Sequence, residues 1–182
     1  MLGRLLSRQL NWFSKVCRTP KEAIEGLKDG ALVMCGGFGL CGTPMNLIGA
    51  IYEAGIKDLT IASNNCGYGG KEEGSDWGPS LLLRNHQIKR MISSYVGENV
   101  EFERQFFSGE LELEICPQGT LAEKCRAGGA GIPAFYTATG VDTIIEKGGF
   151  PIKYKTDANG KLVLDDKGQR VAEITSKPRP SA

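Results

Sequence analysis

A glycine-rich segment at residues 36–44 carries the strongest chemical signal of the sequence. It reads Gly-Gly-Phe-Gly-Leu-Cys-Gly-Thr-Pro and lies between an apolar run and an expected helix. Glycines let a backbone turn sharply and approach a ligand closely. Successive N–H groups beside a helix N-terminus favour an anion, or a carbonyl oxygen that gains negative charge. We therefore predict that this segment binds a ligand and stabilises an oxyanion through Gly36, Gly37, Phe38, Gly39 and Gly42.

The same segment also satisfies a second motif, G-x-G-x-x-G, through Gly37, Gly39 and Gly42. A dinucleotide-binding domain is therefore an alternative interpretation. That fold wants an acidic side chain at the end of its second strand, where it accepts from the ribose hydroxyls. Here Asp58 precedes the second expected strand, and the neutral pair 64–65 (Asn-Asn) follows it. The dinucleotide interpretation is weakened by this pair and stays open.

Composition excludes several other classes of protein. The chain has 182 residues, 41% of them hydrophobic, and a formal net charge of +1. These values suit one globular α/β domain and give no bulk electrostatic reason to bind nucleic acid. No apolar run approaches the roughly 20 residues that span a bilayer, so we expect a soluble protein without membrane contact.

The cysteines do not indicate a metal site. Six are present, at positions 17, 35, 41, 66, 116 and 125, without C-x-x-C spacing and with a single histidine, His86. A zinc site is therefore not expected. Four cysteines lie in or beside apolar or Gly-rich segments, and we interpret these as reduced packing residues. We interpret His86 as a surface or packing residue.

The elements around the glycine segment predict parallel strands. Residues 31–35 form an apolar run that indicates a buried strand, and Pro44 begins a helix that Thr43 can cap and Gly55 ends. Residues 59–63 form a second strand, which completes a βαβ unit. The predicted fold is an open, mainly parallel α/β sheet with helices on both faces and a C-terminal β-hairpin region.

The remaining expected elements continue this alternation. Thr19 caps a first helix that ends near Gly30, and Asn99 caps a helix over residues 100–107. Further strands are expected at 89–95 and 110–116, a helix at 121–127, a glycine connector at 128–131, and a hairpin at 153–164 around Asn159-Gly160. Residues 67–79 are polar and Gly-rich, and we interpret them as a surface insertion.

The first 18 residues differ from the rest of the chain. They hold four basic residues and no acidic one, and their apolar residues recur near helical spacing. This pattern is typical of a mitochondrial transit peptide. The alternative is a basic amphipathic arm without a targeting role. We predict a transit peptide at 1–18 and a folded domain at 19–182.

Longer strings of the sequence resemble the first half of family I CoA-transferases. The similarity begins with Asp29-Gly30, the apolar run and the glycine segment, and it continues to about Arg179. Within the family it is strongest to the mitochondrial 3-oxoacid enzymes of ketone-body use. The segment 67–79 is longer than this resemblance implies, and the chain ends before the family's first half does. The matching strings are residues 29–44, 63–65, 81–84, 87–91, 93–99, 101–105, 117–123, 126–131 and 133–136.

The resemblance implies a reaction and its substrates. Coenzyme A would move from succinyl-CoA to a 3-oxoacid such as acetoacetate in the mitochondrial matrix, with CoA as substrate and no other cofactor. A glutamate attacks the acyl-CoA, and an anhydride and then a glutamyl-CoA thioester follow. A carboxylate nucleophile needs no base, but each tetrahedral species needs donors aimed at its oxyanion. The full enzyme is expected to be a homodimer.

The resemblance also implies which residues face the site. Asn64, Asn65 and Gln118 match amides that face the family's active site. The alternatives are structural roles that involve no ligand. For the two asparagines this is a turn pair tolerant of left-handed φ, and for Gln118 it is a helix-capping amide.

The family's nucleophilic glutamate lies in its second half. Glu98 only superficially resembles it, and a helix-dipole role is the preferred interpretation. Glu101, Glu103 and Arg104 are expected on a solvated helix face. We therefore expect no catalytic residue in this chain and no activity without the second half. The remaining alternative is a catalytically silent CoA-binding or assembly module.

Overall fold

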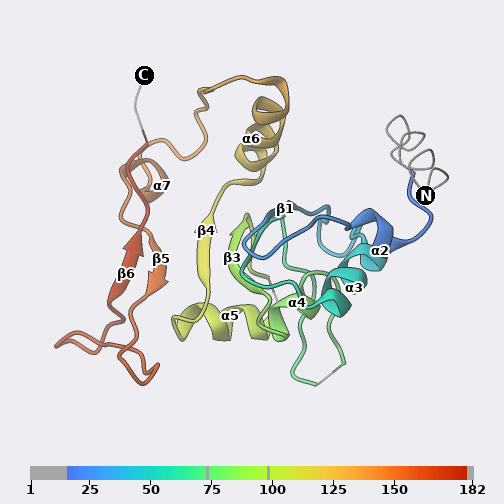
Figure 1. The fold of residues 1–182 in the computed structure, drawn as a ribbon. Helices are drawn as coiled ribbons and strands as arrows, with labels where there is room; N and C mark the ends of the chain where they lie inside the picture. Colours follow the sequence, from blue (N-terminus) through green and yellow to red (C-terminus); the bar gives the residue numbers. More distant parts are fainter. Residues whose placement is uncertain (1–15, 73, 98, 180–182) are drawn as a thin grey trace.

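The computed structural model describes residues 16–72, 74–97 and 99–179. A four-stranded parallel sheet and a two-stranded antiparallel hairpin form its framework (Figure 1). The elements in chain order are α2 (Pro20–Ala23), β1 (Leu32–Met34), α3 (Met45–Ala54), β2 (Leu59–Ala62), α4 (Ser80–Arg84), β3 (Ile88–Ser93), α5 (Val100–Phe107), β4 (Glu112–Ile115), α6 (Gln118–Ala130), α7 (Ile144–Lys147), β5 (Pro151–Tyr154) and β6 (Ala172–Thr175).

One face of the parallel sheet holds the hydrophobic core. The strands lie in the order β1-β2-β3-β4, and their register aligns Val33, Ile61, Met91 and Leu113 in one row. Ile61, Met91 and Leu113 are each at most 2% exposed. They pack against side chains of α3, α4 and α5, which all lie on this face. These features confirm the predicted parallel α/β fold.

The opposite face is covered unevenly. Over β4, α6 lies close enough for Lys124 Nζ to pair with Glu114 Oε1 at 3.1 Å. Over β1, however, Leu32 is 57% exposed and Met34 is 61% exposed. The prediction that this run is a buried strand was therefore wrong, because β1 is the edge strand and is packed on one face only. Successive side chains of a strand point to opposite faces, so its even-numbered residues are left outside.

Local capping explains where most helices begin and end. Asn99 Oδ1 accepts from Phe102 N at 2.9 Å, and α5 spans the predicted residues. Gly55, with φ at 65°, ends α3 as expected. Thr43 does not cap α3, which begins after Pro44 without a side-chain cap; its hydroxyl donates to Leu40 O at 3.4 Å instead.

Two other helices differ in length from the expectation. The helix capped by Thr19 ends at Ala23, well before Gly30. Most of residues 23–27, which were expected to be helical, therefore lie outside this helix. Conversely, α6 continues through the predicted glycine connector and ends at Gly131, which has φ at 70°. A helical glycine costs only about 1 kcal/mol relative to alanine, and the helix tolerates it here.

The C-terminal hairpin extends beyond the predicted one. Asn159 and Gly160 form a turn that is closed by pairing between Thr156 and Leu162, as expected. The strands themselves are β5 and β6, which pair outside that turn, and β5 lies on the side facing β4 (Figure 1).

Residues 1–15 of the predicted transit peptide lie outside the described residues. Among the residues that are described, no helix is long and apolar enough to cross a membrane.

Candidate functional site

The predicted site residues follow the carboxyl ends of three parallel strands. The glycine segment follows β1, Asn64 and Asn65 follow β2, and Gln118 follows β4. The carboxyl ends of parallel strands share one edge of the sheet, which is where α/β folds bind their ligands. The topology thus brings all three groups to the same edge.

The glycine segment folds into a tight turn at this edge. Phe38 N donates to Cys41 O at 3.0 Å, and Cys41 N donates to Phe38 O at 3.2 Å. Gly39 lies in the turn with φ at 61°, a conformation that side chains rarely adopt. Phe38 and Leu40 are 69% and 51% exposed, so the turn projects from the protein.

Close contacts, with backbone at Gly36 and with a side chain at Gly37, explain the first two glycines. A Cβ at Gly36 would lie 2.9 Å from Gly42 O, and one at Gly37 would lie 3.3 Å from Thr43 Oγ1. In contrast, a Cβ at Gly39 or Gly42 would meet nothing within 4 Å. The segment is therefore packed at its base and open at its tip, where a ligand atom can approach.

Asn65 ties the turn to the end of β2. Its Oδ1 accepts from Gly39 N at 3.0 Å and from Asn64 Nδ2 at 2.5 Å. Neither asparagine has a positive φ, so the interpretation as a left-handed turn pair was wrong. The Gly39 N–H is occupied by this bond, which means that a ligand oxygen at this point would compete with Asn65.

Three buried polar atoms near this edge have no hydrogen-bond partner among the described residues: Ser63 Oγ, Asn64 Oδ1 and Ser94 Oγ. Ser63 is 3% exposed, and its Oγ lies 3.6 Å from the position of a Cβ at Gly37. Buried polar groups are normally paired, so unpaired ones mark strain or a ligand that is yet to bind. The prediction from sequence missed both serines because isolated hydroxyls carry no spacing signal.

Gln118 stands apart from these groups. It is the first residue of α6 and is exposed. No side chain caps α6, so the interpretation of Gln118 as a helix cap was wrong. In the described part of the chain, no hydrogen bond joins Gln118 to the turn or to the asparagines. Glu98 lies outside the described residues.

The loop of residues 67–79 is built into the protein and is not a simple surface insertion. Tyr68 and Trp77 pair through two backbone bonds of 3.0 and 2.8 Å. The Asp76 side chain is only 3% exposed and forms an ion pair with Arg84. Helical spacing does not reveal this contact in the sequence, because Asp76 lies in the loop and only Ser80 and Arg84 belong to α4.

Glu103 and Arg104 of α5 are exposed, as expected, and Arg104 forms a network with Glu101 and Glu110 on this face. Arg104 bonds Glu101 and Glu110, with closest N–O distances of 2.7 Å to each. These hydrogen bonds lower the pKa of both carboxyls. His86, which is 63% exposed, lies 3.8 Å from Glu110, as expected of a surface residue.

Two thiols near the site, those of Cys35 and Cys66, are poor nucleophiles. All the described cysteines are free, as predicted. Burial raises the pKa of Cys35, and burial followed by the proximity of Cys35 and Asp76 raises the pKa of Cys66 strongly. A raised pKa keeps a thiol protonated near neutral pH. Cys17 and Cys41 are exposed, so neither is a packing residue.

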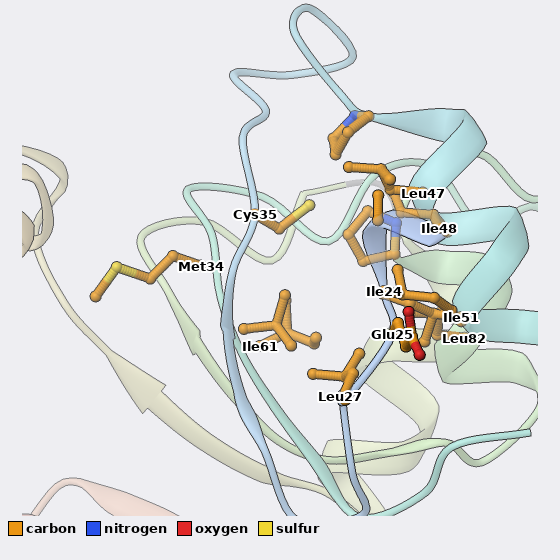
Figure 2. Close-up of a pocket in the computed structure, with 15 residues that line it drawn as sticks. Ile24, Glu25, Leu27, Met34, Cys35, Leu47, Ile48, Ile51, Ile61 and Leu82 are labelled. Carbon is orange, nitrogen blue, oxygen red and sulfur yellow. The ribbon is translucent and has the colours of Figure 1, made fainter. Parts of the chain in front are cut away.

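Of two cavities in the protein, one adjoins the glycine segment, because Cys35 and Pro44 line it, and the other is remote from that segment. Figure 2 shows the apolar one, of about 390 Å³, with Ile24 and Leu27 on one side and Ile48 and Ile51 of α3 on another, while Met34 points away from it. The other, of about 860 Å³, lies between α6 and the hairpin. None of the eight predicted site residues lines either cavity. The candidate site is therefore an open edge.

Known proteins are similar to this chain along most of its length. The family described as Coenzyme A transferase matches residues 17–173. A Bacillus subtilis protein, named as the A subunit of a probable succinyl-CoA:3-ketoacid coenzyme A transferase, is 61% identical over 83% of this chain. The human "Succinyl-CoA:3-ketoacid coenzyme A transferase 2, mitochondrial" is 49% identical over 88% of it. This chain covers 60% of the bacterial protein's length and 30% of the human protein's.

Solved structures share the fold at lower identity. Glutaconate coenzyme A-transferase from Acidaminococcus fermentans has a TM-score of 0.59 at 24% identity, over 72% of this chain and 41% of its own. An E. coli O157:H7 acyl-CoA transferase, solved as a thioester complex with CoA, has a TM-score of 0.58 at 20% identity, over 86% of this chain and 32% of its own.

Proposed function

This chain belongs to the coenzyme A transferase family, and from that premise we propose that it supplies the first-half part of a succinyl-CoA:3-oxoacid CoA-transferase. The enzyme would move CoA from succinyl-CoA to a 3-oxoacid such as acetoacetate, a step of ketone-body breakdown. CoA is a substrate here, and no other cofactor is needed. The relative that shares 61% identity is itself named as the A subunit of such an enzyme, which supports this assignment.

The proposed chemistry assigns the nucleophile to the second half. A glutamate carboxylate there attacks the thioester carbonyl, which gives an acyl-glutamyl anhydride and CoA thiolate. The thiolate then attacks the glutamyl carbonyl, which releases succinate and leaves a glutamyl-CoA thioester. Acetoacetate reverses these two steps and leaves as acetoacetyl-CoA. Each attack creates an oxyanion, and oxyanions are stabilised by fixed N–H donors.

The residues of this chain would supply those donors. The side-chain amides of Asn64, Asn65 and Gln118 would act as donors at this edge. The glycine turn brings backbone N–H groups to the same edge, where a ligand oxygen would compete with Asn65 for that of Gly39. The observation that carries the proposal is the Gly39–Asn65 bond of 3.0 Å, because it fixes an open, Cβ-free backbone turn beside buried polar groups that lack partners among the described residues. Preorganised donors of this kind cost no reorganisation when the charge forms.

The open edge suggests how the enzyme is assembled. A second half would close the site by placing its glutamate over the glycine turn, and the exposed Phe38 and Leu40 give it apolar surface to contact. We propose the second half as the obligatory partner and a homodimer for the complete enzyme.

We also propose the mitochondrial matrix as its location. Residues 1–18 have the composition of a transit peptide, and the human relative is called mitochondrial. Amino-terminal sequencing of the protein recovered from the matrix should find a start near Thr19. An intact Met1 on matrix protein would contradict this.

A reconstituted enzyme tests the proposed reaction. The chain is coexpressed with the partner subunit of the Bacillus subtilis relative, and the transfer of CoA from succinyl-CoA to acetoacetate is measured. We expect transfer by the mixture and a fall in kcat on the order of 10²-fold for Asn65→Ala, the size of one lost oxyanion contact. Asn46→Ala, on the exposed side of α3, is the matched control and should retain the wild-type rate. Full activity of Asn65→Ala would contradict the assigned site.

A further inference from the structure

The 67–79 loop touches the candidate site at both of its ends. It begins directly after Asn65 and Cys66. The backbone oxygen of Cys66 accepts from Asn99 Nδ2 at 3.3 Å. It ends at Gly78, whose N–H donates to Met45 Sδ at 3.2 Å at the start of α3. The two ends also meet each other, because a Cβ at Gly67 would lie 1.9 Å from Trp77 O. A displacement of one end must therefore move the other.

One ion pair fixes the returning half of this loop. Arg84 of α4 binds both carboxylate oxygens of Asp76: Nη2 donates to Oδ1 at 3.1 Å and Nε donates to Oδ2. Arg84 Nη2 also donates to Gly70 O at 2.7 Å, and Ser80 Oγ donates to Asp76 Oδ1 at 2.9 Å. The pair thus connects α4 to both the first and the second half of the loop. A nearly buried, bidentate pair of this kind holds its geometry more firmly than an exposed one.

The Thr43 side chain lies between the fixed loop and the glycine turn. A Cβ at Gly78 would lie 3.1 Å from Thr43 Cγ2, and one at Gly37 would lie 3.3 Å from Thr43 Oγ1. Thr43 therefore fills the space between the loop and the turn, and its hydroxyl donates to Leu40 O inside the turn. The start of the loop follows Asn65 along the chain, and the Asn65 side chain accepts from Gly39 N.

We propose that Asp76 and Arg84 are positioning residues whose ion pair holds the 67–79 loop so that Asn65 and the glycine turn keep their contact. Neither residue touches the Gly39–Asn65 bond, so both act through Gly78, Thr43 and the start of the loop. The importance of this positioning for catalysis rests on the proposed function, whereas the positioning itself is a property of this chain alone.

Nuclear magnetic resonance of the full chain tests the proposal without any ligand. Hydrogen exchange of the Gly39 amide and the chemical shift of the Asn65 side-chain amide are compared between the wild type and Asp76→Asn. We expect the Gly39 amide to exchange about five- to tenfold faster in the variant, the factor that one lost hydrogen bond carries. Core amides such as that of Met91 should be unchanged, which separates positioning from general destabilisation. Glu123→Gln, which breaks an exposed ion pair with Arg126 on α6, is the control and should leave Gly39 unchanged.

Two further variants keep the test decisive if Asp76→Asn does not fold. Arg84→Lys keeps the charge but loses the bidentate geometry, and Ser80→Ala removes one bond to Asp76. Each should accelerate Gly39 exchange by a smaller factor. If these variants accelerate exchange at Tyr68 and Trp77 but leave Gly39 and Asn65 at their wild-type values, the ion pair organises its own loop only and the proposal is overturned. Because no substrate is used, this result does not depend on the transferase reaction.

Discussion

At the scale of single residues, two serines near the site differ in how they are satisfied. Ser63 and Ser93 are both 3% exposed or less, but only Ser93 has partners: its Oγ donates to Asn64 O at 2.9 Å and contacts Tyr95 O at 3.2 Å. The Ser63 hydroxyl has none among the described residues. A buried hydroxyl without a partner lowers the free energy of unfolding, whereas a hydrogen-bonded one raises it. The strain at Ser63 is what a ligand-binding residue would carry before its ligand arrives.

This difference predicts opposite effects of the same substitution. Ser63→Ala should leave the free energy of unfolding unchanged or raise it by up to about 1 kcal/mol. Ser93→Ala, the matched control, should lower it by about 1 kcal/mol or more, because it leaves two backbone oxygens with fewer donors. Urea unfolding of the chain measures both. A loss at Ser63→Ala as large as that at Ser93→Ala would mean that Ser63 is bonded in solution.

Two glycines offer a second comparison at this scale. Gly39 has φ at 61°, whereas Gly49 lies inside α3, and a Cβ at either would meet nothing within 4 Å. Gly39→Ala should therefore lower the free energy of unfolding by about 1 kcal/mol, through backbone strain alone. Gly49→Ala should raise it by about 0.5–1 kcal/mol, because alanine is the better helix former. Equal effects at the two positions, measured by thermal or urea unfolding, would show that Gly39 is not held at positive φ.

At the scale of elements, the charged network on α5 gives the structure a pH dependence. The hydrogen bonds of Arg104 lower the pKa of Glu101 and Glu110 in the folded chain. A carboxyl whose folded pKa is lowered adds stability above its unfolded pKa of about 4.3, and this stability is lost as the pH falls through the folded pKa. The network therefore stabilises the protein at neutral pH and stops doing so in acid.

Arg104→Gln should remove most of this pH dependence. At pH 7 the variant should be less stable by roughly 1 kcal/mol, a value reduced for solvent screening because Arg104 and Glu110 are partly exposed. Near pH 3 the variant and the wild type should converge. Urea unfolding at both pH values measures the difference, with Lys89→Gln on β3 as the control for lost charge. A constant gap between variant and wild type would mean that the two carboxyls do not titrate with the network.

Elements with strong local signals were predictable from sequence, and those decided by tertiary packing were not. The α5 helix matched because Asn99 marks its first turn and the apolar residues recur at helical spacing. The exposure of Leu32 and Met34 was missed, because an apolar run looks the same in a central strand and in an edge strand.

The candidate site divides in the same way. The glycine turn has its own signature, so its existence and place were predictable. The Gly39–Asn65 bond spans 26 residues, and the Asp76–Arg84 pair depends on where a loop folds back, so neither follows from local spacing. Gln118 was placed correctly at the end of β4, but its side chain meets no other part of the site among the described residues.

At the scale of the whole molecule, the candidate site would be one wall of a larger enclosure in the proposed enzyme. The glycine turn, the asparagines and Gln118 lie on an open edge, and none of the eight predicted site residues lines either of the two cavities. The wall supplies neutral N–H donors and lacks a carboxylate among its predicted residues. Donors of this kind stabilise charge but do not form a covalent bond to an acyl group. In the proposed enzyme, the covalent intermediate must therefore form on the second half.

A wall of neutral donors predicts where CoA becomes attached. After incubation with succinyl-CoA, the intact mass of the isolated chain should be unchanged. When its partner from the Bacillus subtilis enzyme is added, the increase in mass that corresponds to bound CoA should appear on the partner, and excess acetoacetate should remove it. Asn65→Ala in this chain should slow the appearance of the adduct on the order of 10²-fold without moving it to another chain. A partner preparation that has been unfolded by heat controls for non-specific thioester exchange. A CoA adduct on this chain, located to one of its own carboxylates, would place the nucleophile in the first half. That result would contradict the proposal that the nucleophile lies on the second half.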